Sequence, residues 1–132
     1  MSQARKNTPP RPNADPEARK WARLSKLGTT SPSCLICGET DDRCLERHHV
    51  AGRKYSDLIG ILCSNCHDKA SDKQKDHPGT AAGKPTELEC IGRLLLGLAD
   101  FFEMLAMQLI QFGRYLIELA ADANRQGQEN VQ

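Results

Sequence analysis

The chain has 132 residues and a mass of 14.6 kDa, which is the size of one domain or of a small domain with an extension. Its 39% hydrophobic and 27% charged residues are typical of a globular protein and exclude a wholly disordered or collagen-like chain. The net charge of +1 hides a division: residues 1–85 carry 15 Lys and Arg against 10 Asp and Glu, whereas residues 86–132 carry 3 against 7. The basic front half favours an anionic partner such as nucleic acid.

Residues 1–28 are predicted to form a basic flexible arm that ends in a short helix. Residues 1–14 are rich in Pro, Asn and Arg and cannot bury enough apolar surface to offset the entropy of ordering. The chain starts without the apolar stretch of a secretory signal, which favours a cytoplasmic location.

The short helix is expected over residues 17–27. Asp15 followed by Pro16 is typical of an N-cap and a first helical turn, and Gly28 is a typical stop signal. We expect two apolar side chains to hold this helix against the rest of the protein, Trp21 and Leu24.

Four of the six cysteines form two C-x2-C pairs that are separated by 25 residues. Each pair can bind a metal from one tight turn, and two pairs complete the tetrahedral shell of four sulfurs that Zn2+ favours. Paired spacing of this kind indicates a structural zinc site in a reducing compartment, and the alternative is a set of unrelated buried cysteines. The expected zinc ligands are Cys34, Cys37, Cys63 and Cys66.

Three histidines lie close to these cysteines in the sequence. His48 and His49 fall in a predicted strand over residues 44–50, and His67 begins a polar helix that follows a second short strand over residues 59–62. Because neighbouring strand residues point to opposite faces, His48 and His49 cannot serve the same purpose on a regular strand. One could bind a second metal together with His67 while the other lies beside a substrate; the alternative is that each is a surface or capping residue.

The region from about residue 34 to residue 78 resembles the HNH (ββα-metal) endonucleases. The likeness rests on the first C-x2-C pair, on the string Glu46-Arg-His-His-Val50-Ala-Gly-Arg53, and on Leu62-Cys-Ser-Asn-Cys-His67. It implies a two-stranded hairpin and a helix around a catalytic divalent metal such as Mg2+. The nuclease domain would span residues 29–78.

The resemblance also implies a role for each histidine. His48 matches the metal ligand, His49 matches the general base that activates water, and His67 matches the ligand on the helix. The family's middle residue, usually Asn, orients the base, but no Asn lies between His49 and Cys63 in this chain. Of the candidates by spacing, Tyr55, Ser56 and Asp57, we assign this position to Asp57, which lacks the amide donor of Asn.

The chemistry of phosphodiester hydrolysis suits this set of residues. A neutral imidazole accepts a proton near pH 7, and a divalent cation stabilises charge on the phosphate. Three cationic residues flank the histidines and could hold DNA phosphates, although they could equally be solvated surface charges: Arg47, Arg53 and Lys54.

The C-terminal part is predicted to be a linker over residues 79–85, a long helix over residues 86–125 and a flexible tail over residues 126–132. Apolar residues recur at alternating steps of three and four, which predicts a coiled-coil seam and a homo-oligomer. The seam consists of Leu88, Ile91, Leu95, Leu98, Phe102, Leu105, Leu109, Phe112, Leu116 and Leu119.

The same helix could instead pack on the chain's own domain, or associate with a membrane, although charged residues interrupt a membrane-length segment. The sequence therefore predicts an α+β protein, in which a small zinc-stabilised ββα-metal (HNH) unit precedes a long C-terminal helix. We expect a metal-dependent DNA endonuclease with zinc as its structural metal. The alternative is a non-catalytic zinc module that binds DNA or protein and has a helical tail.

Overall fold

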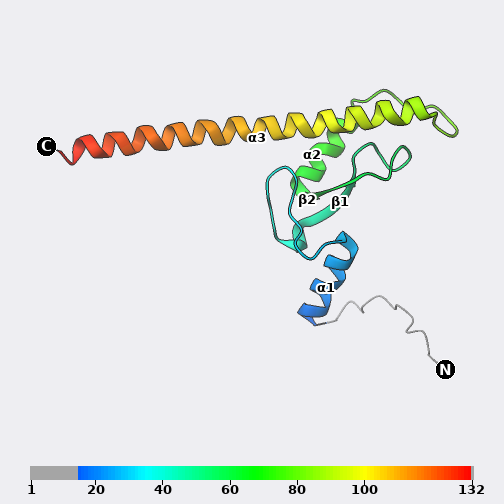
Figure 1. The fold of residues 1–132 in the computed structure, drawn as a ribbon, viewed down its shortest axis with the longest axis horizontal. Coiled ribbons are helices and arrows are strands. Elements are labelled where there is room, and N and C mark those ends of the chain that lie inside the picture. The colour runs from blue at the N-terminus through cyan, green and yellow to red at the C-terminus, as the bar shows by residue number, and fades with distance from the viewer. Residues whose placement is uncertain (1–14, 132) are drawn as a thin grey trace.

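The computed structural model describes residues 15–131, so the predicted arm over residues 1–14 lies outside the described part. The elements follow the chain as α1 (Pro16–Leu27), the short 3-10 helix η1 (Asp42–Cys44), β1 (Leu45–His49), β2 (Ile59–Cys63), α2 (Ser64–Gln74) and α3 (Glu87–Glu129). This mixed α/β architecture, with one two-stranded sheet and a long C-terminal helix, confirms the coarse fold class. Figure 1 shows α3 as a rod, with the hairpin and α2 against its first half and α1 at the far end of the domain.

Helix α1 begins and ends where the sequence predicts. The Asp15 carboxylate accepts a hydrogen bond from the Ala18 N–H, and Gly28 closes the helix with a left-handed backbone at φ 80°. Leu24 is buried as expected, but Trp21 is 57% exposed, so its expected docking role is wrong. The reason is that α1 rests on η1 and β1 along one narrow stripe, which Leu24 and the Arg23–Asp42 ion pair occupy.

Strands β1 and β2 form an antiparallel hairpin whose register runs from Leu45 opposite Cys63 to His49 opposite Ile59. Leu62 is fully buried at its centre, within a core that also contains three of the four paired cysteines. Helix α2 follows β2 without a connecting loop, because Cys63 is both the last strand residue and the N-cap of the helix. Sheet and helix therefore share this cysteine as a fixed corner.

The first half of α3 packs on the domain at very short range. Gly97 lies so close to the loop after β1 that an added Cβ would stand 1.9 Å from the Val50 carbonyl oxygen. In the next two helical turns Phe101 and Met104 are buried, and Phe101 also reaches Gly60 of β2. Part of α3 thus packs on the chain's own domain, one of the alternatives that the sequence leaves open.

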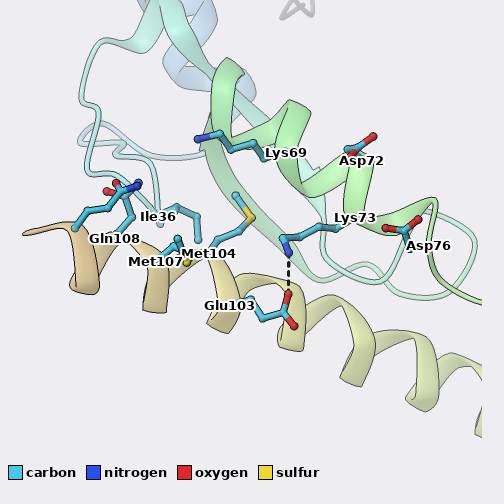
Figure 2. A pocket seen from close by; sticks show the side chains of 10 residues that line it. Ile36, Lys69, Asp72, Lys73, Asp76, Glu103, Met104, Met107 and Gln108 are labelled. Atoms are coloured by element: carbon cyan, nitrogen blue, oxygen red, sulfur yellow. Dashed lines mark hydrogen bonds and ion pairs between the residues drawn. The ribbon is translucent and has the colours of Figure 1, made fainter.

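Polar contacts bind the segment between α2 and α3 to both helices. The Arg93 guanidinium donates to the backbone carbonyls of Pro78 and Gly79. Farther along, His77 pairs with Asp100 at 2.8 Å. Figure 2 shows a further link, in which Lys73 of α2 pairs with Glu103 of α3 at 2.7 Å.

The second half of α3 extends beyond the domain (Figure 1), and residues 114–129 are exposed along its whole length. The helix continues through Glu129, so the predicted helix end at residue 125 and the flexible tail from residue 126 are wrong for residues 126–129. Gly127 weakens a helix by only about 1 kcal/mol and no proline follows it, so it does not end the helix. None of the helices within residues 15–131 has the length and apolar character needed to cross a membrane.

Candidate metal centre and the adjoining cationic cavity

The first cysteine pair lies on a tight loop held by backbone hydrogen bonds. The Cys34 N–H donates to the Glu39 carbonyl at 2.8 Å, and the Gly38 N–H donates to the Cys34 carbonyl at 3.0 Å. Gly38 adopts φ 80°, a left-handed backbone that favours glycine. The Leu35 N–H also donates to Ile61 of β2, so this loop is attached to the sheet edge.

The second pair lies where β2 passes into α2. The Cys63 sulfur accepts the Cys66 N–H at 3.4 Å and thereby caps the helix. Cys34, Cys63 and Cys66 are buried, whereas Cys37 is exposed. A loop, a strand end and a helix start therefore meet at one cluster.

The four sulfurs of this cluster lie within 4.8 Å of one another, and those of Cys37 and Cys63 are 3.6 Å apart. A tetrahedral ion with Zn–S bonds of about 2.3 Å requires its sulfurs to be about 3.8 Å apart. The cluster thus has the donor set and the spread for a metal such as zinc, as the sequence predicts. Within residues 15–131 no other group of three or more His, Cys, Asp or Glu ligand atoms is gathered in this way.

The electrostatics of the cluster favour a bound cation. Burial raises the pKa of Cys34, but backbone N–H groups of Cys37, Cys63 and Ile36 donate to its sulfur and bring that pKa down to about 7. Burial, followed by contact with the neighbouring sulfurs, raises the pKa of Cys66. A divalent cation bound among these four cysteines would stabilise their thiolate forms.

The histidines of β1 lie in different surroundings, as strand alternation predicts. His48 is buried, stacks on Phe101 with ring centroids 5.7 Å apart, and meets the edge of the His67 ring at 5.1 Å. Burial, then repulsion from His67 and His49, lowers the pKa of His48 to about 4. Its imidazole is therefore neutral at pH 7, the form that binds metals.

The Glu46 carboxylate orients His67, a role that the sequence motif containing Glu46 does not reveal. The His67 Nδ1 pairs with Glu46 of β1, which also accepts a hydrogen bond from the Ser64 hydroxyl at 3.3 Å. A His Nδ1–H that donates to a carboxylate leaves the Nε2 lone pair available to a ligand. Glu46 and His67 are 21 residues apart, so only the folded hairpin and helix bring them together.

His49 and His67 line a shared cavity of about 470 Å³. Its walls come from α1, η1, β1, the loop between the strands and α2. Two of the predicted DNA contacts, Arg47 and Arg53, lie in these walls. Sequence reasoning did not place the other cationic residues of the cavity at this site: Arg23, Lys26 and Arg43.

Besides the four cysteines, the structure leaves three predicted site residues outside the lining of this cavity: His48, Lys54 and Asp57. Lys54 donates to the Ala81 carbonyl at 3.2 Å. Asp57 is exposed and makes no hydrogen bond or ion pair within residues 15–131. The hairpin end is instead held by Gln74 of α2, whose amide donates to the carbonyls of His49 at 3.2 Å and Val50 at 3.3 Å. No sequence signal marks Gln74, because it lies 25 residues from the strand.

A second cavity, of about 460 Å³, lies between α2 and α3 (Figure 2). Its floor is formed by Ile36, Met104 and Met107, and its rim carries both Lys and acidic side chains. Its lining contains neither His nor Cys.

Comparisons of this chain with protein-family models, with curated proteins and with solved structures find no match. On its own fold and site, the chain is a small mixed α/β protein with four cysteines positioned to bind a metal such as zinc.

Proposed function

We propose that this protein is a metal-dependent endonuclease of the HNH type that hydrolyses DNA phosphodiester bonds, with zinc at the four cysteines as its structural metal. The observation that carries the proposal is the shared cavity, which His49 of β1 and His67 of α2 line together with five Arg and Lys side chains. The order of hairpin and helix, β1, β2 and α2, is the one that the family resemblance implies.

In this proposal each residue has a separate task. His49 would take the proton of the attacking water, because it is the less buried member of the histidine pair and lines the cavity. Arg47 and Arg53 would hold the DNA backbone by its phosphates. A divalent cation such as Mg2+, held by His48 and His67, would supply charge stabilisation at the phosphate.

One observation favours a second candidate, a zinc module that binds DNA or protein without cleaving it. The only group of three or more metal ligands within residues 15–131 is the cysteine cluster, and no third side chain joins His48 and His67 in such a group. In this alternative the cationic cavity would bind phosphates and the histidines would be structural.

Plasmid cleavage separates the two candidates. Supercoiled DNA is incubated with the full chain and Mg2+ or Mn2+, beside His49→Ala and the control His77→Ala, whose imidazole pairs with Asp100 away from the cavity. We expect nicking by the wild type and the control, and a loss of at least about 100-fold in His49→Ala. Thermal melting of each variant shows that it remains folded.

Equal nicking by the wild type and His49→Ala, or nicking by neither, would remove the endonuclease proposal. Retarded migration of DNA in a gel without any cleavage would support the non-catalytic module instead. Zinc analysis of the same samples shows whether the cysteine cluster is loaded in each variant.

A further inference from the structure

Helix α3 has two apolar faces, and the domain covers only one of them. The buried residues Arg93, Gly97, Phe101 and Met104 recur at steps of four, four and three, and so lie on one side of the helix. At 100° per residue, the opposite side carries the first position of every heptad in the predicted seam. The domain therefore covers part of the seam, Leu98 and Leu105, and leaves the first position of each heptad exposed.

The uncovered face, here called the outer face, is a row of large residues beside a row of small ones. The large residues are between 49% and 82% exposed: Leu88, Leu95, Phe102, Leu109 and Leu116. The small residues lie four positions after each of them: Gly92, Ala99, Ala106, Gly113 and Ala120. Figure 1 shows the hairpin and α2 together on one side of the helix, with the segment between α2 and α3 along its other edge near the start of α3.

We propose that the outer face is the interface of a homodimer in which two copies of α3 pair in antiparallel orientation. In one register every large residue meets a small residue of the second copy. Leu95 then lies opposite Ala120, Phe102 opposite Gly113, and Leu109 opposite Ala106. Because the helices are antiparallel and identical, each such contact occurs twice, as a closed two-fold interface requires.

A parallel pair would lack this match. It would place Leu95 against Leu95 and Ala99 against Ala99, so that crowded layers alternate with empty ones. Charge gives the same answer on one edge of the face. Arg114 has no ion-pair partner within residues 15–131, and antiparallel pairing brings it within one helical turn of Glu103 of the second copy, a carboxylate that also pairs with Lys73 of its own chain. Parallel pairing would place the two Arg114 side chains on opposite edges of the interface.

The size of the outer face is adequate for a stable dimer. Residues 88–120 span about 50 Å of helix, and a helix about 10 Å wide gives a projected area of roughly 500 Å². The accessible surface of protruding Leu and Phe side chains exceeds their projection, so the buried area approaches the roughly 800 Å² per partner of a standard interface. A monomer would instead leave this whole face in water.

Charge substitutions on the outer face test the dimer and its orientation with the full chain. Ala99→Lys and Leu116→Glu are each expected to weaken dimerisation at least about 100-fold in sedimentation equilibrium. In the proposed register residue 99 faces residue 116 of the second copy. The double variant Ala99→Lys/Leu116→Glu therefore forms two Lys–Glu contacts and is expected to recover dimerisation to within about 10-fold of the wild type.

Gln111→Lys is the matched control, because residue 111 lies on the domain-facing side of the helix; its dimerisation is expected to be unchanged. Helical circular dichroism and zinc content establish that each variant is folded. The double variant Ala106→Glu/Leu109→Lys repeats the test at a second contact of the same register. A wild type that is monomeric at about 100 µM overturns the dimer. Double variants no stronger than their single variants overturn the antiparallel register.

Discussion

Replacing Gly97 by alanine tests how α3 is held on the domain. The new methyl group would lie 1.9 Å from the Val50 carbonyl oxygen and 2.7 Å from its carbon. These atoms belong to the backbone, so no side-chain rotation can relieve the clash. We expect α3 to move away from the loop after β1 and to leave a gap along this contact.

The size of the effect follows from what the gap exposes. Phe101 and Met104 are 7% and 6% exposed, and burying each such side chain contributes about 1.5–3 kcal/mol. Loss of both contacts costs about 3–6 kcal/mol, whereas alanine stabilises a helix by about 1 kcal/mol relative to glycine. We therefore expect Gly97→Ala to lower the free energy of unfolding by about 2–5 kcal/mol.

Urea unfolding of the zinc-loaded protein, followed by circular dichroism, measures this change. Gly127→Ala is the matched control, since it lies in the same helix beyond the outer face and an added Cβ would meet nothing within 4 Å. It is expected to raise stability by up to about 1 kcal/mol. If Gly97→Ala behaves like Gly127→Ala, the close approach of α3 to the Val50 backbone is refuted.

Three further predictions concern the metal centre, pH and DNA. Cys37→Ser should lose both the bound zinc and the fold of the domain, because zinc binding in comparable small sites contributes about 10–16 kcal/mol. Cys44→Ser, outside the cluster, should retain both. Metal analysis and circular dichroism check this. Burial and the neighbouring imidazoles lower the pKa of His48 from its ordinary 6.5 to about 4, so the unfolded chain binds more protons between these values. The contribution of His48 to the free energy of unfolding should therefore be complete above about pH 6.5. It should fall towards pH 4 by up to about 1.4 kcal/mol per pH unit. Urea unfolding at a series of pH values should show a smaller pH dependence in His48→Gln. If the cavity binds DNA, Arg53→Ala should weaken binding and reduce the salt slope by about one, whereas Lys54→Ala should change neither; equal effects in a salt titration would contradict this assignment.

The local elements could be predicted because their causes are local. Asp15 and Gly28 define the ends of α1 through contacts within four residues, and Cys63 and Cys66 lie one helical turn apart. Spacing within each cysteine pair likewise predicts a metal-binding turn, and the structure brings the two pairs together as expected. The histidine positions follow from strand alternation, which separates buried His48 from His49 in the cavity wall.

The surroundings of the site depend on contacts between distant residues. Periodicity alone gives α3 an apolar seam, but it cannot show that Gly97, outside that seam, is the point at which the helix approaches the domain. Nor can the sequence distinguish the neighbours Arg53 and Lys54, of which only Arg53 lines the cavity. Gln74 holds the hairpin end across 25 residues, a contact that no spacing in the sequence predicts.

The sequence by itself thus determines where α1 begins and ends and which cysteines can share a metal, because caps and chelating turns act over a few residues. Tertiary structure alone decides which face of α3 the domain covers, which cations reach the cavity and which carboxylate orients His67. The physical reason is that close packing selects among faces that are equally apolar in the sequence, and only the folded chain brings the competing surfaces together.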